Sequence, residues 1–160
     1  MDQDTKKKAL RSITYGLYVA TAVQGEHYAA GTVNWLSQAS FTPPLVMAGF
    51  RVDSGLRGVV EATGAFAINT LAAHQKDVAQ AFFKPAELVD GKLNGYEFEP
   101  GPETGAPLFL DLPSWFEARV TDVVERGDHS VFVGEVVAVG VRYPEALPLA
   151  MRETGWSYGG

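Results

Sequence analysis

The chain has 160 residues, 46% hydrophobic and 20% charged, and this composition indicates one globular domain over residues 1–160. The sequence contains no cysteine, which excludes disulfides, thiolate nucleophiles and cysteine-bound metals and suits a cytoplasmic protein. The net charge is −6 and the only basic cluster is Lys6–Lys8, so nucleic acid is not expected as a partner and an anionic ligand would need a local positive site.

The start of the chain predicts a short helix rather than a targeting segment. Residues 4–11 have helical character, with Asp4 or Thr5 as the N-cap. No apolar segment follows the charged residues, so a secretory signal is not expected. No apolar run approaches the roughly 20 residues that cross a membrane, so a membrane partner is not expected either.

Six segments predict β-strands, because they are rich in apolar, β-branched and aromatic residues and turn-forming residues bound them. These segments are residues 15–23, 27–36, 43–50, 65–72, 114–125 and 129–142. A double proline fixes the start of the third strand, and Gly134 predicts a bulge or a bend in the sixth.

Two further helices are predicted at residues 54–64 and 74–84, the first with Ser54 as its N-cap and Gly64 as its stop. Residues 85–107 are rich in glycine, proline and acids and predict a long surface excursion. Six strands with few helices favour a mainly β fold, an antiparallel six-stranded barrel with peripheral helices, over a parallel α/β sheet. No GxGxxG motif follows the first strand, so a Rossmann fold is not expected.

Residues 31–46, GTVNWLSQASFTPPLV, contain a polar and aromatic loop without a carboxylate. Such a loop offers hydroxyls, amides and backbone N–H groups, which are the groups that bind an anion or a planar heterocycle. The alternative is a connection whose polar side chains satisfy its own backbone. The candidate binding residues of the loop are Asn34, Trp35, Ser37, Gln38 and Ser40.

The segment RVDSGLRG places Arg51 and Arg57 on either side of Ser54, where a helix is predicted to begin. A helix N-terminus with a hydroxyl and guanidinium groups nearby can bind a phosphate. The alternative is an ordinary N-cap with two surface arginines.

His129 follows a Gly–Asp turn and precedes the sixth predicted strand, so it either caps the turn or faces a ligand. His27 and His74 lie beside a turn and a helix start and are interpreted as solvated residues. With three dispersed histidines and no cysteine, no metal site is expected. Ser157 lacks the G-x-S-x-G elbow of a hydrolase.

Five segments follow one another in the order and spacing of the flavin reductase-like proteins: YGLYVATA, GTVNWLSQASFTPPLV, FAINTL, AFF and GDHSVFVGEV. Over roughly residues 10–145 the chain resembles this family of FMN-binding split barrels, which includes the reductases of two-component flavin monooxygenases. The resemblance implies a homodimer that binds FMN, or FAD, and reduces flavin with NADH or NADPH for a monooxygenase or another redox partner. The alternative function is an FMN-carrying electron-transfer protein.

The resemblance also implies roles for particular residues. The histidine of the Gly-Asp-His motif, His129, would lie near the flavin ring where nicotinamide stacks, and Arg51, Ser54 and Arg57 would complete the phosphate site. The loop before the double proline would wrap the flavin ring; its residues are Thr32, Val33, Asn34, Trp35, Leu36, Ser37, Gln38 and Ser40.

Two features leave alternatives open. Many relatives carry two small hydroxyl residues where this chain has Asn34–Trp35, so flavin is expected either as a held cofactor or as a substrate that leaves reduced. A split barrel that binds another planar ligand, such as haem or pyridoxal phosphate, is a third hypothesis.

Trp156 and Tyr158, near the C-terminus, either form a loose tail or fold over the pocket of a partner subunit.

Overall fold

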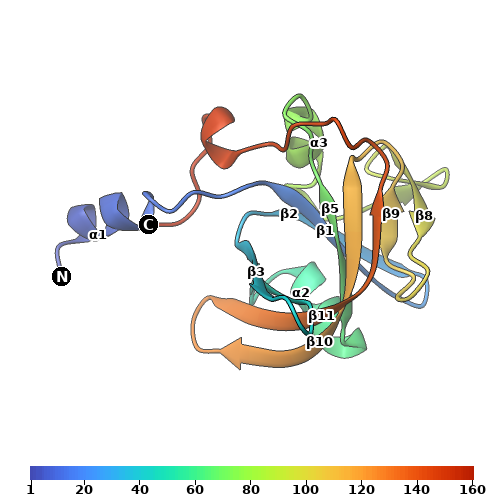
Figure 1. Cartoon of the computed structure of the whole chain (residues 1–160), viewed down its shortest axis with the longest axis horizontal. Coiled ribbons are helices and arrows are strands. Elements are labelled where there is room, and N and C mark those ends of the chain that lie inside the picture. The colour runs from blue at the N-terminus through green and yellow to red at the C-terminus, as the bar shows by residue number, and fades with distance from the viewer.

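The computed structural model describes residues 1–160 and is mainly β (Figure 1). The strands of the main antiparallel sheet are β1 (Tyr18–Gln24), β2 (His27–Val33), β3 (Leu36–Ser40), β4 (Leu45–Arg51), β5 (Ala65–Thr70), β10 (Ser114–Glu125) and β11 (His129–Val141). A smaller sheet contains β6 (Leu88–Val89), β7 (Lys92–Leu93), β8 (Tyr96–Pro100) and β9 (Pro107–Phe109). The helices are α1 (Gln3–Leu10), α2 (Gly55–Thr63), α3 (Lys76–Ala81) and the 3-10 helix η1 (Met151–Glu153).

The main sheet forms a barrel that is split at one corner. Its strand order is β2-β1-β5-β10-β11-β4-β3, so β2 and β3 are the two edges. Only Asn34 and Trp35 connect these edges. Because consecutive Cα atoms are about 3.8 Å apart, Val33 and Leu36 lie within about 11 Å of each other, yet no ladder joins the two strands. The mainly β, antiparallel fold with peripheral helices is confirmed.

Aromatic rings fill the interior of the barrel. Phe50 packs between Phe66 and Phe132, with ring centroids 5.6 and 5.5 Å away, and all three side chains are buried. The register of β10 and β11 shifts directly after the Val120–Gly134 pair, but the extra residue there, Thr121, belongs to β10 and not to the strand in which Gly134 predicted a bulge. The extra residue of β11 is Val137, and the two bulges help the long strands to bend around the core.

Helix α2 packs on β1 and β2 and has the two ends that the sequence predicted. The Ser54 hydroxyl accepts a hydrogen bond from the Arg57 N–H at 3.1 Å. Gly64 ends the helix in the left-handed region, with φ 67°, and its N–H donates to the Val60 carbonyl. The helix thereby holds the segment after β4 in one position.

Helix α1 projects from the barrel, and the C-terminal segment runs back to meet it (Figure 1). Its N-cap is Asp2, whose carboxylate accepts from the Thr5 N–H at 2.7 Å, rather than Asp4 or Thr5 as expected. The Arg11 Nε atom donates to the Gly159 carbonyl at 3.2 Å and joins the two terminal segments. No helix in the structure is both long enough and apolar enough to span a membrane.

Three local predictions are wrong. Leu36–Ser40 is not a loop but the edge strand β3, paired with β4, because an edge strand can turn polar side chains to solvent. Residues 85–107 are not a plain surface excursion, since short strands fold there and bury Leu93 completely. Asp90 and Asn94, both with positive φ, make the tight turns between these strands. The third helix covers only Lys76–Ala81.

Candidate active site

Arg51 and His129 stand opposite each other on neighbouring strands. Arg51 is the last residue of β4, His129 is the first of β11, and the register of the two strands pairs them. Directly opposed residues have Cβ atoms about 4.5–5.5 Å apart and side chains on the same face. The Val52 N–H also donates to the Asp128 carbonyl at 3.0 Å. Two segments far apart in the sequence thus form one end of the barrel.

This end of the barrel opens into a cleft of about 780 Å³, called the His129 cleft below. Its volume lies within the range of roughly 300–1,000 Å³ that is usual for small-molecule sites. It is lined by Lys6, Leu10, Ile13, Tyr15, Trp35, Arg51, Val52, Asp53, Asp128, His129, Tyr158, Gly159 and Gly160.

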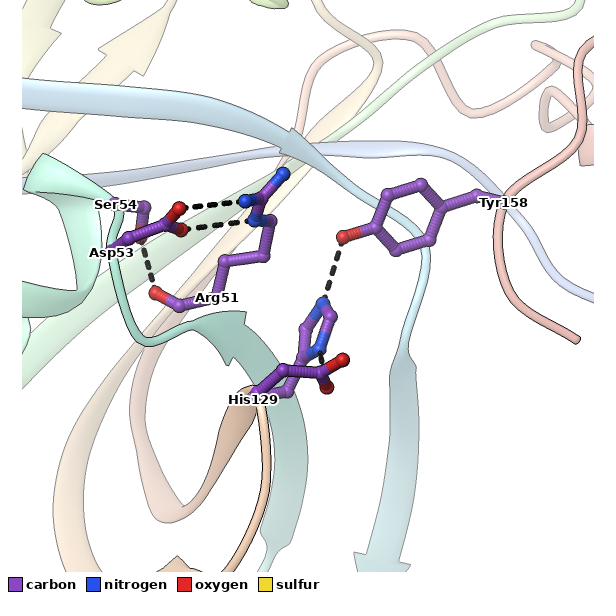
Figure 2. Close-up of polar contacts among 6 residues, drawn as sticks. Arg51, Asp53, Ser54, His129 and Tyr158 are labelled. Carbon is purple, nitrogen blue, oxygen red and sulfur yellow. Dashed lines mark hydrogen bonds and ion pairs between the residues drawn. The ribbon is translucent and has the colours of Figure 1, made fainter.

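Three neighbours hold the imidazole of His129. Its Nδ1 atom lies 2.8 Å from Oδ1 of Asp128, and its Nε2 atom lies 2.7 Å from the hydroxyl of Tyr158. The Trp35 ring packs against it with centroids 4.3 Å apart. Figure 2 shows Tyr158 reaching the imidazole from the C-terminal segment, on the side away from the strand. The histidine is therefore part of the cleft wall as well as of the turn before β11.

Two buried donors at the split corner have no partner within the protein. They are Nδ2 of Asn34 and the indole Nε1 of Trp35. The backbone fixes the indole, since the Trp35 carbonyl accepts from the Gly49 N–H at 2.8 Å and the ring packs over Gly49. An unpaired buried donor costs about 1–3 kcal/mol, and acceptor atoms of a ligand would remove that cost.

The cleft contains charges of both signs. Arg51 donates to the Asp53 carboxylate at 2.9 and 2.6 Å, and this hydrogen bond with the charge of Asp53 raises the pKa of Arg51. The hydrogen bond with His129 lowers the pKa of Asp128. Burial raises the pKa of Tyr158 against the opposing effect of Arg51, so the phenol keeps its proton at neutral pH.

A second, smaller cleft of about 360 Å³ lies beside β3 and β4 and is called the Gln38 cleft. Burial raises the pKa of the Tyr18 hydroxyl at its wall. The cleft is lined by Tyr18, Leu36, Ser37, Gln38, Pro44, Leu45, Val46, Phe116, Val136 and Val139. The candidate loop residues therefore divide, with Trp35 in the His129 cleft and Leu36, Ser37 and Gln38 in the Gln38 cleft.

The three candidate phosphate residues have different surroundings. Arg51 lines the His129 cleft and its side chain is 57% exposed, so a ligand can reach it. The Ser54 hydroxyl is engaged in the N-cap and donates to the Arg51 carbonyl at 2.9 Å. Arg57 pairs with Glu61 and Glu125 and joins α2 to β10. Arg51 is thus the member of this group with access to the cleft.

The other candidates lie on the edge strands. The Thr32 hydroxyl donates to the Ala79 carbonyl at 2.6 Å and ties β2 to α3. Val33 ends β2 opposite Tyr18, and Ser40 ends β3 opposite Leu45. These residues hold the strands on either side of the split corner.

Three residues of the cleft whose side chains hydrogen-bond to candidate side chains are themselves absent from the set of candidates drawn from the sequence. Asp53 and Asp128 each sit beside a candidate, and an acid next to a predicted anion site is the signal that could have found them. Tyr158 lies in the terminal segment, for which a loose tail and a partner's pocket are the two expectations. In the structure it folds into the cleft of its own chain, where no local sequence pattern predicts it.

An open antiparallel barrel, with unpaired buried donors at its split corner and a cleft at one end, defines a split-barrel protein with a candidate small-molecule site. The chain belongs to the flavin reductase like domain family, whose model matches residues 10–156. The mainly β fold and the family resemblance predicted from the sequence are both confirmed.

Individual relatives support the same assignment. The chain is 31% identical over 138 residues to a probable flavin reductase of Rhizobium meliloti (strain 1021), covering 86% of this chain and 43% of that protein. It is 30% identical over 152 residues to the flavin reductase (NADH) of Kitasatospora aureofaciens, covering 93% and 78%. A solved bacterial structure, the flavin reductase component of a two-component tryptophan halogenase, is 27% identical with a TM-score of 0.77, covering 90% and 89%. The chain spans only 43%, 52% and 45% of three of its curated relatives.

Proposed function

We propose that this chain is an NAD(P)H-dependent flavin reductase that binds FMN at the His129 cleft. The observation that carries the proposal is the unpartnered buried indole Nε1 of Trp35, a residue that lines this cleft, with the unpartnered Nδ2 of its neighbour Asn34, which lies beside the cleft without lining it. The carbonyl oxygens and ring nitrogens of an isoalloxazine are acceptors that suit these donors. Family membership supports the same ligand class.

Arg51 would hold the FMN phosphate. Its guanidinium is exposed in the cleft and at present bound to Asp53, which a phosphate would replace. Guanidinium groups bind phosphate through paired, charge-assisted hydrogen bonds. Ser54 would contribute indirectly, because its hydroxyl fixes the start of α2 and the carbonyl of Arg51. Arg57 would stabilise α2 rather than contact the phosphate.

When bound, the flavin supplies the redox chemistry, because it accepts a hydride from NADH or NADPH and passes the electrons on. The residues of this chain bind and orient the two ligands. Trp35 and His129 present a packed pair of aromatic rings to the cleft. His129 would position the nicotinamide, and the backbone N–H groups of residues 33–37 would hydrogen-bond the flavin ring.

Anaerobic mixing tests the proposal. We expect FMN to bind, and NADH or NADPH to bleach the flavin absorbance of the mixture. His129→Ala should slow this bleaching by about 10- to 100-fold while FMN affinity stays unchanged, because small displacements of reacting groups are costly. A protein that binds FMN but is bleached by dithionite alone would reject the reductase function.

A second candidate function is an FMN-carrying electron-transfer protein that does not bind nicotinamide. One observation favours it: the Tyr158 hydroxyl already occupies Nε2 of His129, the residue expected to face the nicotinamide. In that case neither NADH nor NADPH would bleach the bound flavin, while a reduced protein partner would do so. The same mixing experiment therefore separates the two functions.

We further propose that the chain acts as a homodimer and supplies reduced flavin or electrons to a monooxygenase or another redox protein. Val139 and Val141 are 69% and 67% exposed near the end of β11, and Val139 lines the Gln38 cleft. Apolar residues exposed on one face of a strand would be covered if they contacted a second subunit. Light scattering at micromolar concentration tests the dimer, and a monomer would reject it.

A further inference from the structure

Both ring nitrogens of His129 are already occupied. Asp128 is ionised at neutral pH and can only accept hydrogen bonds, so the 2.8 Å contact places a proton on Nδ1. In the neutral imidazole Nε2 is then an acceptor, and the Tyr158 hydroxyl donates to it across 2.7 Å. The imidazole therefore has no free polar atom to offer a ligand, whereas the hydroxyl oxygen of Tyr158 keeps its acceptor capacity.

Tyr158 is held from both sides along the chain. Two residues before it, the Trp156 ring lies between the Phe83 ring, with centroids 4.8 Å apart, and the Lys76 ammonium, 4.6 Å from the ring centre. One residue after it, the Gly159 carbonyl accepts from Arg11. The segment is thus anchored, and Tyr158 keeps a defined position in the cleft.

The Tyr158 ring also packs edge-on against the rings of Trp35 and His129, which form the aromatic wall of the cleft. Its centroid lies 5.5 Å from that of Trp35 and 5.8 Å from that of His129, with interplanar angles of 64° and 81°. This geometry directs the hydroxyl along the face of the wall and toward Nε2 (Figure 2). A planar ligand stacked beside His129 would meet the hydroxyl at its edge.

Resting on the proposed reductase function, we propose that Tyr158, and not His129, makes the polar contact with the nicotinamide. The hydroxyl accepts a hydrogen bond from the carboxamide NH₂ group, while His129 and Asp128 orient the hydroxyl by fixing the direction of its proton. His129 is then a positioning residue for Tyr158, and the Asp128–His129–Tyr158 chain selects a dinucleotide that carries a carboxamide.

Tyr158→Phe tests this assignment with two dinucleotides. NADH has the carboxamide NH₂ group, and reduced 3-acetylpyridine adenine dinucleotide has a methyl group in its place. In the FMN-loaded protein, the dissociation constant for each dinucleotide is obtained from the dependence of the anaerobic flavin-reduction rate on its concentration, and the variant should raise that for NADH by about three- to tenfold, the effect of one neutral hydrogen bond. The dissociation constant for the acetylpyridine analogue should not change. Tyr143→Phe, an exposed tyrosine outside the cleft, is the matched control and should leave both constants unchanged.

Two results would overturn the assignment while leaving the reductase function intact. Equal weakening of both dinucleotides would mean that Tyr158 only supports the shape of the cleft. Tighter binding of both would mean that its ring obstructs the nicotinamide position. If the wild-type protein binds FMN but neither dinucleotide bleaches it, the proposed function fails and this assignment fails with it. The wild-type control therefore distinguishes the two failures.

Discussion

The indole of Trp35 and the imidazole of His129 pack with ring centroids 4.3 Å apart. Trp35 belongs to the two-residue link between the edge strands β2 and β3, and His129 opens β11. Strand β4 lies between β3 and β11 and joins them: Gly49 donates to the Trp35 carbonyl, and Arg51 is the register partner of His129. Strand β4 therefore connects the split corner of the barrel to the His129 cleft.

Trp35→Phe tests the indole N–H as a flavin contact. The variant keeps an aromatic ring against His129, and it removes a buried donor that has no partner in the protein together with part of the ring that packs on Gly49 and Gly159. We expect FMN affinity to fall by about three- to tenfold, and the smaller ring to lower the free energy of unfolding of the FMN-free protein. Fluorescence titration and urea unfolding measure the two quantities. Lower stability with unchanged affinity would assign the indole N–H to the fold.

Arg51→Ala and Arg57→Ala separate a phosphate contact from a structural ion pair. Arg51 faces the His129 cleft, whereas Arg57 pairs with Glu61 and Glu125. Arg51→Ala should weaken FMN binding about tenfold or more and leave riboflavin binding unchanged, because riboflavin lacks the phosphate. Arg57→Ala should leave both affinities unchanged and lower thermal stability. Equal losses for FMN and riboflavin in Arg51→Ala would contradict a phosphate role.

Asp53→Asn should raise the affinity for FMN, whereas Arg51→Ala should lower it. The Asp53 carboxylate holds the Arg51 guanidinium and would repel an incoming phosphate. Replacing it with the neutral amide should therefore strengthen FMN binding at low salt and have less effect at high salt, where charge is screened. Titrations with FMN at two ionic strengths check this. Weaker FMN binding in the variant would mean that Asp53 holds Arg51 in its binding position.

The Asp128–His129 pair makes stability depend on pH in acid. The hydrogen bond with His129 lowers the pKa of Asp128 below its ordinary value of 3.8. A carboxyl with a lowered folded-state pKa stabilises the fold above its unfolded pKa, and this contribution is lost as the pH falls through the folded value. When the pH is lowered below 3.8, the free energy of unfolding should therefore fall less in Asp128→Asn than in the wild-type protein. Urea unfolding over a series of pH values measures this difference. Asp122→Asn is the control, and an equal effect there would contradict the pairing.

Gly101→Ala tests the packing beneath the small sheet. An added Cβ would lie 2.0 Å from Oε1 of Glu117, a fully buried carboxylate held by the Thr104 hydroxyl and backbone N–H groups. Since that carboxylate has no room to move, the variant should lose about 1–3 kcal/mol of stability. Gly58→Ala, inside α2 with nothing near the added atom, should instead gain up to about 1 kcal/mol. Thermal melts compare the two variants.

The sequence by itself determined six strands of the main sheet, the helix α2 and the family. Alternating apolar residues place the six main strands, and Ser54 and Gly64 set the ends of α2, because these signals act within a few residues of the chain. The same local reasoning fails for β3, whose polar residues look like a loop until β4 pairs with them. It also fails for Leu93, since burial depends on what packs above a short strand.

Only the tertiary structure decided which candidates share a cleft. The register of β4 and β11 brings Arg51 to His129, and α2 and β10 draw Arg57 away into its ion pairs. Tyr158 reaches His129 because contacts of Trp156 and Gly159 with distant residues fix the terminal segment. Strand register, ion pairing between elements and the docking of a terminal segment all depend on residues that are remote in sequence, and no local pattern encodes such contacts.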